Sequence, residues 1–168
     1  MSQAITTQSP ITATAVPADS TLAFFKNQLR YDAPALSFSV SIEEFLQKHI
    51  NDNQPVVSID LLYAHLYGRT TGYKASPCQF YTLSNGGFYM APTIDKLTIK
   101  TGEVSGDAAG IFITLCALAD CIQKRIALRE GPDSKGCTAD DDKLYDQYYA
   151  LREYAQNHAE SGMILGAN

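Results

Sequence analysis

The sequence predicts a single α+β domain in which a small antiparallel β-meander packs against several α-helices. Asn85-Gly86 stands between two alternating apolar segments and is a preferred dipeptide of tight hairpin turns. After Ser105, an alanine-rich segment repeats apolar residues every three or four positions, as an amphipathic helix does. The length of 168 residues is typical of one domain with its own core.

A two-residue turn at Asn85-Gly86 sets the register expected for the hairpin. Both central residues of a type I′ turn need a positive φ, which Asn and Gly tolerate. Three pairs of residues would then lie opposite each other, namely Ser84 and Gly87, Leu83 and Phe88, and Tyr81 and Met90. The second face of the hairpin would carry Phe80, Thr82, Ser84 and Tyr89. Residues 96–100 predict a third strand at the exposed edge of the meander, with Leu97 and Ile99 pointing inward.

The part before the hairpin divides into an arm and four short elements. Residues 1–18 lack periodicity and are rich in Ser, Thr, Gln, Ala and Pro, so they predict a flexible N-terminal arm before a domain over residues 19–168. A first helix would begin at Asp19 or Ser20, and a brief strand would occupy residues 36–40. A capping box at Ser41 predicts the next helix, and Ser58 would cap another that ends near Gly68.

Two long helices are expected after the meander. Ser105 is a suitable N-cap for the first, with Asp107 in the first turn, where the helix dipole stabilises a carboxylate. Its apolar side would carry Ile111, Leu115, Leu118, Ile122 and Ile126, and its small residues Ala108, Ala109, Gly110 and Ala117 predict close packing against the sheet. The second begins at Thr138, and a short helical turn would follow over residues 158–165. The inner side of the second long helix would carry Leu144, Tyr148, Leu151 and either Tyr154 or Ala155.

Composition argues against several classes of function. The net charge is −5, and all of the excess lies beyond residue 100, where eleven acids face six bases. The basic stripe of a nucleic-acid binder is absent, so DNA binding is expected to be weak. No stretch approaches the roughly 20 apolar residues of a membrane helix, which favours a cytoplasmic protein. The four cysteines form no C-x-x-C pair, so buried reduced thiols are expected rather than a zinc site, and no cofactor is predicted.

The sequence offers little for catalysis. His49, His65 and His158 fall on separate expected helices without a metal-binding motif. The glycine-rich segment 84–87 precedes a strand rather than a helix and lacks the lysine of a phosphate-binding loop. A nucleophilic Cys78 or Ser84 acting with His65 remains open, but the favoured interpretation is a binding protein and not an enzyme.

Two surfaces are candidates for binding a partner. The first is an acidic and tyrosine-rich surface on the last long helix, because tyrosine is enriched at interfaces. Its residues are Asp140, Asp141, Asp142, Tyr145 and Tyr149. The second is the hairpin, with Ser84, Asn85 and Tyr89, to which Asp107 is added as a candidate contact. For Asp107 and the three consecutive acids, stabilisation of a helix start is the favoured alternative to a partner contact.

Three segments of the chain resemble a known family. They are FYTLSNGGFYMAP at 80–92, SGDAAGI at 105–111 and YYALREYAQNHAE at 148–160, and they occur in the family's order. In these segments the chain is similar to the plasmid-borne ArdB/KlcA antirestriction proteins, whereas the match over residues 1–50 is poor. The resemblance implies relief of type I restriction of incoming DNA, with the type I restriction endonuclease complex as the direct or indirect partner.

Charge argues against imitation of DNA. Duplex DNA carries one negative charge per about 1.7 Å, so a domain about 40 Å long would need on the order of 20 aligned charges. The excess here is five. A contact with the restriction complex that blocks translocation or cleavage is therefore preferred. The alternatives are a hydrolase or nucleic-acid-modifying enzyme that acts on restriction intermediates and a small DNA-binding protein. The second would use Lys96, Lys100, Lys124, Arg125 and Arg129.

Overall fold

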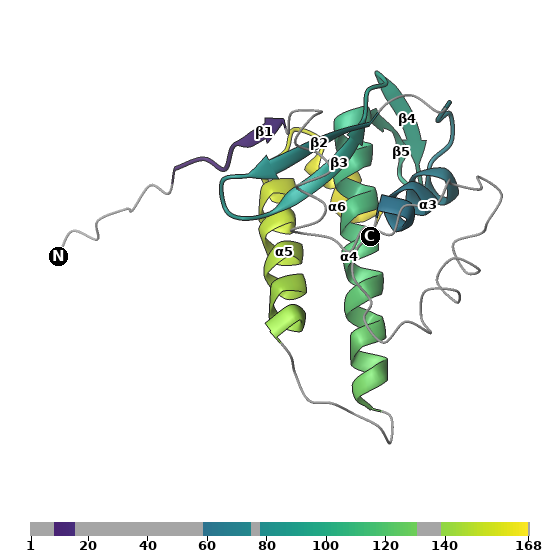
Figure 1. Cartoon of the computed structure of the whole chain (residues 1–168). Helices are drawn as coiled ribbons and strands as arrows, with labels where there is room; N and C mark the ends of the chain where they lie inside the picture. Colours follow the sequence, from purple (N-terminus) through teal and green to yellow (C-terminus); the bar gives the residue numbers. More distant parts are fainter. Residues whose placement is uncertain (1–8, 16–58, 75–77, 131–138, 168) are drawn as a thin grey trace.

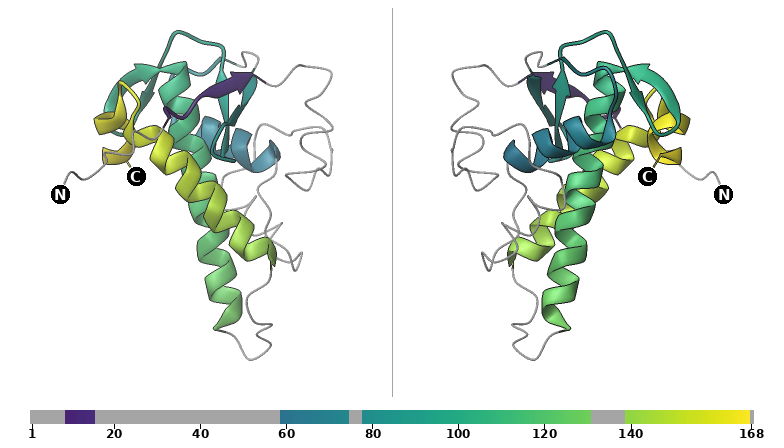
Figure 2. Two further views of the ribbon diagram at one scale, coloured as in Figure 1. Left: turned by 90° about the vertical axis from the view of Figure 1, so that its left-hand side faces the viewer. Right: turned by 90° about the vertical axis from the view of Figure 1, so that its right-hand side faces the viewer.

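The computed structural model describes residues 9–15, 59–74, 78–130 and 139–167 (Figure 1). Two small antiparallel sheets lie at one end, and two long helices extend away from them (Figures 1 and 2). The strands are β1 (Ala13–Ala15), β2 (Cys78–Leu83), β3 (Phe88–Pro92), β4 (Lys96–Ile99) and β5 (Gly102–Ser105). The helices are α3 (Ile59–Arg69), α4 (Gly106–Arg129), α5 (Ala139–Gln156) and α6 (Ser161–Gly166). The helices expected from Asp19 or Ser20 and from Ser41, and the strand over 36–40, lie outside the described residues.

The first sheet has the order β1-β2-β3. Its outer strand β1 falls within residues 1–18, where the sequence predicts a flexible arm. Ala13 pairs with Leu83, and Ala15 pairs with Tyr81. The side chain of Ser84 accepts a hydrogen bond from the Thr12 N–H at 3.0 Å and so extends this contact. This part of the arm therefore belongs to the sheet.

The predicted third strand of the meander pairs elsewhere. β4 forms a separate two-stranded sheet with β5, after a turn in which Gly102 has a φ of 135°. The meander prediction is wrong at this point because the free edge of β3 is covered by α4, where the Met90 N–H donates to Thr114 Oγ1 at 3.2 Å. Leu97 and Ile99 are nevertheless buried, as their alternation predicts.

The hairpin between β2 and β3 has a three-residue loop, Ser84 to Gly86. Gly86 has a φ of 91°, its N–H donates to the Leu83 carbonyl, and the Leu83 N–H donates to the Gly87 carbonyl. The expected two-residue turn is therefore wrong by one residue. In the observed register Tyr81 lies opposite Tyr89, Phe80 opposite Met90, and Thr82 opposite Phe88. A shift of one residue exchanges the two faces of a strand, so Tyr81 and Tyr89 now share a face.

Helix α4 is the centre of the core. It contacts α3, α5, α6, β3 and the second sheet, and Figure 1 shows it passing beside the sheets and continuing beyond them. Every residue from Ala108 to Leu118 is buried, which fits a helix that is apolar on all sides. The predicted stripe holds for Ile111, Leu115 and Leu118, whereas Ile126 is 40% exposed. The core therefore surrounds the first half of α4 rather than one face of its whole length.

Gly110 sets how closely α4 approaches β3. A Cβ atom at this position would overlap the Met90 carbonyl oxygen and would lie 2.6 Å from Ala91 Cα. Thr114, one turn later, donates to the Gly110 carbonyl at 2.8 Å while it accepts the Met90 N–H. The small residues predicted to allow close packing therefore do so at Gly110.

The length and composition of α4 would also allow it to cross a membrane. Residues Gly106–Ala127 meet this criterion, which corrects the expectation that no stretch approaches it. Since 72% of the apolar stretch that meets this criterion is buried inside the protein, α4 is typical of the core helix of a folded domain. Cys116 and Cys121 on this helix are buried free thiols, as predicted, and Cys78 is half-buried, while Cys137 lies outside the described residues.

Candidate interaction surface

The three segments that resemble the antirestriction family meet at the start of α4. Ser105 caps this helix by accepting the Ala108 N–H at 3.1 Å, so the prediction for this N-cap is confirmed. Its hydroxyl also donates to Glu160 Oε2, and its N–H donates to Glu160 Oε1 at 3.0 Å. The second segment thus holds the end of the third through a single serine.

Asp107 joins the first segment to the third. Its Oδ1 accepts the hydroxyl of Tyr89 at 2.8 Å, and its Oδ2 lies 3.1 Å from His158 Nε2. Tyr89 stacks on Tyr81 at 4.8 Å and on Tyr154 at 5.8 Å between ring centroids. Asp107 lies in the first turn of α4, as predicted, and the contacts show that its carboxylate also organises a tyrosine and histidine cluster.

The hydrogen bonds of His158 fix its tautomer. Nδ1 accepts the N–H of Glu160 at 3.0 Å, so in the neutral ring the proton lies on Nε2, which donates to Asp107. Both ring nitrogens are therefore engaged. A histidine that acts as a general base needs a nitrogen within hydrogen-bond reach of the proton that it removes. The arrangement of Asp107 and His158 accordingly fits a structural tie better than a catalytic pair.

Tyr89 is not exposed for contact with a partner in the way that the sequence predicts. Its side chain is only 1% exposed, because the observed register turns it toward Tyr154 and α4. Burial, together with the hydrogen bond to Asp107, raises the pKa of Tyr89 far above its ordinary value, so it stays a neutral donor. Its available role is to hold Asp107, whose side chain is 40% exposed.

The hairpin loop contacts α5. Asn85 Nδ2 donates to the Ala150 carbonyl at 2.9 Å and to Glu153 Oε2 at 3.2 Å, and Asn85 Oδ1 accepts the Gly87 N–H. These bonds give a physical reason for the three-residue loop, because the Asn85 side chain serves the helix as well as the turn. Ser84 is exposed beside Asn85 at the tip.

One side of α5 carries a row of exposed residues that leads to this loop. Asp142, Asp146, Tyr149 and Glu153 follow each other at spacings of four, three and four, which places them on one helix face. All four are exposed, and Tyr149 reaches 59%. We call these four residues the α5 stripe. Since Glu153 accepts the bond from Asn85, the stripe and the hairpin tip form one continuous surface.

The remaining predicted residues surround the stripe. Tyr145 is half-buried on α5, while Asp140 and Asp141 lie in its first turn, and their side chains fall outside the description. Tyr148 makes an edge contact with Tyr149 at 5.5 Å. On the inner side Leu144, Leu151 and Ala155 are buried, as predicted. The structure thus separates the candidates into the exposed α5 stripe with the hairpin tip and the buried Tyr89, which holds the partly exposed Asp107.

The sequence reasoning missed four residues of this region. Asp146 and Glu153 belong to the stripe, and their spacing from Asp142 and Tyr149 is a signal that would have found them. His158 and Glu160 hold the start of α4 from 51 and 55 residues away. Their only signal was that both lie within the third resembling segment.

Comparisons with known proteins bear on the family and the fold of this chain. Residues 71–167 match the model of the family described as antirestriction protein. An antirestriction protein KlcA of Escherichia coli is 44% identical over 102 residues, which cover 56% of this chain and 63% of that protein. The alignment thus spans less than two thirds of that relative. A second Escherichia coli KlcA is 39% identical over 114 residues, covering 64% of this chain and 73% of that protein.

The solved structures of KlcA and ArdB are described as a novel fold with antirestriction activity against type I DNA restriction systems in vivo but not in vitro. One of these chains aligns with a TM-score of 0.63 at 29% identity, over 95% of this chain and 96% of that chain. The α+β fold of this protein is therefore the fold of those structures. With more than half of its residues matched by the family model, the chain belongs to the ArdB/KlcA family of antirestriction proteins.

Proposed function

We propose that this protein relieves restriction of incoming DNA by type I restriction-modification systems. The observation that carries the proposal is the family match over residues 71–167. This range includes the α5 stripe and the residues that meet at the start of α4, which we call the α4 junction: Tyr89, Ser105, Asp107, His158 and Glu160. The solved relatives act against type I systems in vivo but not in vitro. Relief by this protein is accordingly expected in the cytoplasm of a living cell, on the restriction complex, directly or through another component of the cell.

The proposed mechanism does not imitate DNA. The α5 stripe spans eleven residue steps, from Asp142 to Glu153, or about 16 Å at the rise of an α-helix. Duplex DNA would present about nine charges over that length. The stripe offers Asp142, Asp146 and Glu153, and the basic residues Lys143 and Arg152 are exposed on the same helix. A shape-specific contact centred on Tyr149, with the acids at its sides, fits this surface better than a charge pattern.

The α4 junction supports a role that is not enzymatic. Catalysis by a serine or histidine needs a nucleophile, a base and an open position for the substrate. Here Ser105 is bonded to Glu160 and Ala108, and both nitrogens of His158 are engaged. These bonds favour an interaction protein over a hydrolase that acts on restriction intermediates.

The first test is the plating efficiency of unmodified phage on cells that carry a type I restriction system, with methylation scored in parallel. The protein is expected to restore plating while methylation stays normal. Substituting Asp146→Lys in the stripe should reduce this relief on the order of tenfold, the factor that corresponds to a loss of about 1.4 kcal/mol of binding.

Asp95→Lys is the matched control. Asp95 is exposed between β3 and β4, and each of the two variants changes the net charge from −5 to −3. The control should keep full relief at equal protein level and equal circular dichroism. Equal losses in the two variants would favour a mechanism based on overall charge. Full relief in both would remove the stripe from the mechanism, and no relief by the unmodified protein would overturn the proposed function.

A further inference from the structure

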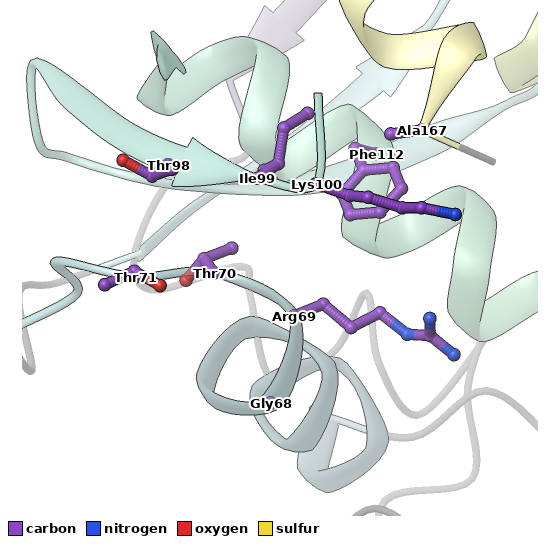
Figure 3. A pocket seen from close by; sticks show the side chains of 9 residues that line it. All are labelled: Gly68, Arg69, Thr70, Thr71, Thr98, Ile99, Lys100, Phe112 and Ala167. Carbon is purple, nitrogen blue, oxygen red and sulfur yellow. The ribbon is translucent and has the colours of Figure 1, made fainter. Parts of the chain in front are cut away.

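A pocket of about 380 Å³ lies between the end of α3, the end of β4 and the first half of α4 (Figure 3). It is separate from the α5 stripe and from the junction at Asp107. Its lining includes Arg69 and Lys100, the hydroxyl residues Thr71 and Thr98, and the apolar residues Ile99 and Phe112. This volume lies within the range of small-molecule sites, which combine an apolar wall with a few polar groups.

Buried neighbours fix the position of Arg69. Its Nε donates to Nδ1 of the fully buried His65 at 2.8 Å. Its Nη2 lies 3.8 Å from Asp120, and His65 Nε2 lies 3.1 Å from the same carboxylate. Burial would raise the pKa of Asp120, but the contacts with His65 and Arg69 outweigh it and lower the pKa, so Asp120 stays ionised. The guanidinium is thus held in place before any ligand arrives, which reduces the entropic cost of binding.

Lys100 supplies the second positive charge. Figure 3 shows its side chain extending above that of Arg69 in the same direction, so that both charged ends lie at one side of the pocket. No ion pair of Lys100 occurs with any residue that the structure describes, whereas Lys96 on the same strand region pairs with Glu103 at 2.8 Å. Because Asp120 is ionised, Arg69, Lys100 and Asp120 together carry a net charge of +1.

The surroundings of the two charged groups bear on the ligand that they could take. Thr71 and Thr98 are exposed, and Figure 3 shows their side chains at the other side of the pocket, away from the charged ends of Arg69 and Lys100. The C-terminal end of α3 disfavours anions. Thr70 offsets part of this effect, since its hydroxyl donates a hydrogen bond to the Leu66 carbonyl near the end of the helix. A planar guanidinium and an ammonium group on the same side of the pocket match a phosphate group, which has three acceptor oxygens and more negative charge, better than a carboxylate, which has two oxygens.

We propose that this pocket binds a small molecule through a phosphate group, with Arg69 and Lys100 as the charged contacts and Phe112 as part of the apolar wall. The proposal goes beyond the antirestriction function and does not depend on it. A phosphate alone would occupy only the charged side of the pocket. A nucleoside monophosphate would also use the apolar wall and is expected to bind more tightly than inorganic phosphate.

The test is an amide NMR titration of the full chain with inorganic phosphate, adenosine monophosphate and adenosine. Both phosphate-bearing probes should give saturable shifts at residues 69–71 and 98–100, and adenosine should bind more weakly than its monophosphate. Lys100→Gln should weaken binding of the monophosphate about fivefold, a typical effect of one partly exposed charge. Lys96→Gln, which removes the same charge outside the pocket, should change it less than twofold, roughly the noise of such measurements.

Three results would overturn the proposal. One is the absence of saturable shifts around the pocket with either phosphate-bearing probe. Another is equal binding of adenosine and its monophosphate, because the phosphate would then contribute nothing. The third is an equal loss in the Lys100→Gln and Lys96→Gln variants, which would indicate non-specific attraction. Plating assays of the same variants would report on the antirestriction function separately.

Discussion

At the scale of single residues, the absence of a Cβ atom at Gly110 determines how closely α4 packs against β3. Gly110 lets the backbone of α4 touch that of β3, and Thr114 then closes the free edge of the strand. A backbone carbonyl cannot move aside as a flexible side chain can. The position therefore tolerates no Cβ without displacement of the helix.

We predict that Gly110→Ala lowers the free energy of unfolding by about 2 kcal/mol. Overpacking against backbone costs about 1–3 kcal/mol or more, and the gain in helix propensity of about 1 kcal/mol recovers only part of it. Urea unfolding followed by circular dichroism measures the change. The matched control is Gly162→Ala in α6, where a Cβ would meet nothing within 4 Å, so its midpoint should stay the same or rise. An unchanged midpoint for Gly110→Ala would contradict the close seating of α4.

The sequence predicted some single residues well and others not. Ser105 as N-cap and Gly110 as a close-packing position follow from local chemistry, and both are confirmed. The hairpin register that the turn preference of Asn85-Gly86 predicts is wrong by one residue. The amide of Asn85 bonds to Ala150 and Glu153 on α5, and these tertiary bonds are absent from any local window of sequence.

At the scale of elements, Ser105 links the start of α4 to the residues that precede α6. Its hydroxyl accepts from Ala108 and donates to Glu160, so one side chain caps α4 and anchors the chain after α5. Partial burial would raise the pKa of Glu160. The hydrogen bonds from the hydroxyl and the N–H of Ser105 outweigh that effect and leave the pKa lower than its usual value of 4.5.

This shift predicts a pH dependence of stability. A carboxyl whose pKa is lower in the folded state contributes stability that is present above its unfolded pKa and is lost as the pH falls through its folded pKa. The wild type should therefore lose stability as the pH drops below about 4.5. Glu160→Gln should be less stable at pH 6 and should show a shallower decline toward pH 3. Asp120, whose pKa is also lowered, keeps its own share of the decline in both proteins.

Urea midpoints measured at intervals from pH 6 to pH 3 test this prediction. The control is Glu130→Gln, which changes an exposed residue at the other end of α4 and should follow the wild-type curve. A parallel decline in wild type and Glu160→Gln would show that the tie between Ser105 and Glu160 contributes nothing that depends on pH.

The elements themselves were predicted more reliably than their pairing. α3, α4, α5 and α6 are found where the apolar spacing and the caps place them. The strand pairing differs from the prediction because the element that covers the edge of a sheet is determined by tertiary packing and not by the strand's own sequence. α4 occupies the free edge of β3 and so directs β4 to β5, while β1 comes from a segment without any periodic signal. The same reasoning applies to the site, since several of its contacts join residues that lie 51 to 68 positions apart in the chain and carry no local signal.

At the scale of the whole molecule, packing is concentrated around the first half of α4. Residues from Ala108 to Leu118 are buried on every side, whereas Gln123, Ile126 and Ala127 are exposed. Figures 1 and 2 show this second half extending away from the two sheets. Burial of this kind divides one continuous helix into parts of different local stability.

We therefore predict a gradient of amide hydrogen exchange along α4. Amides from Ile111 to Leu118 should exchange only through global unfolding, with free energies of opening near that of the whole domain. Amides from Gln123 to Arg129 should exchange faster, through local fraying at the end of the helix. Mass-spectrometric exchange on peptides from the two halves measures both rates. In Gly110→Ala the protection of the first half should fall while that of the second half changes little, because only the first half is seated on β3. Equal protection along the whole helix would show instead that the second half is packed as firmly as the first.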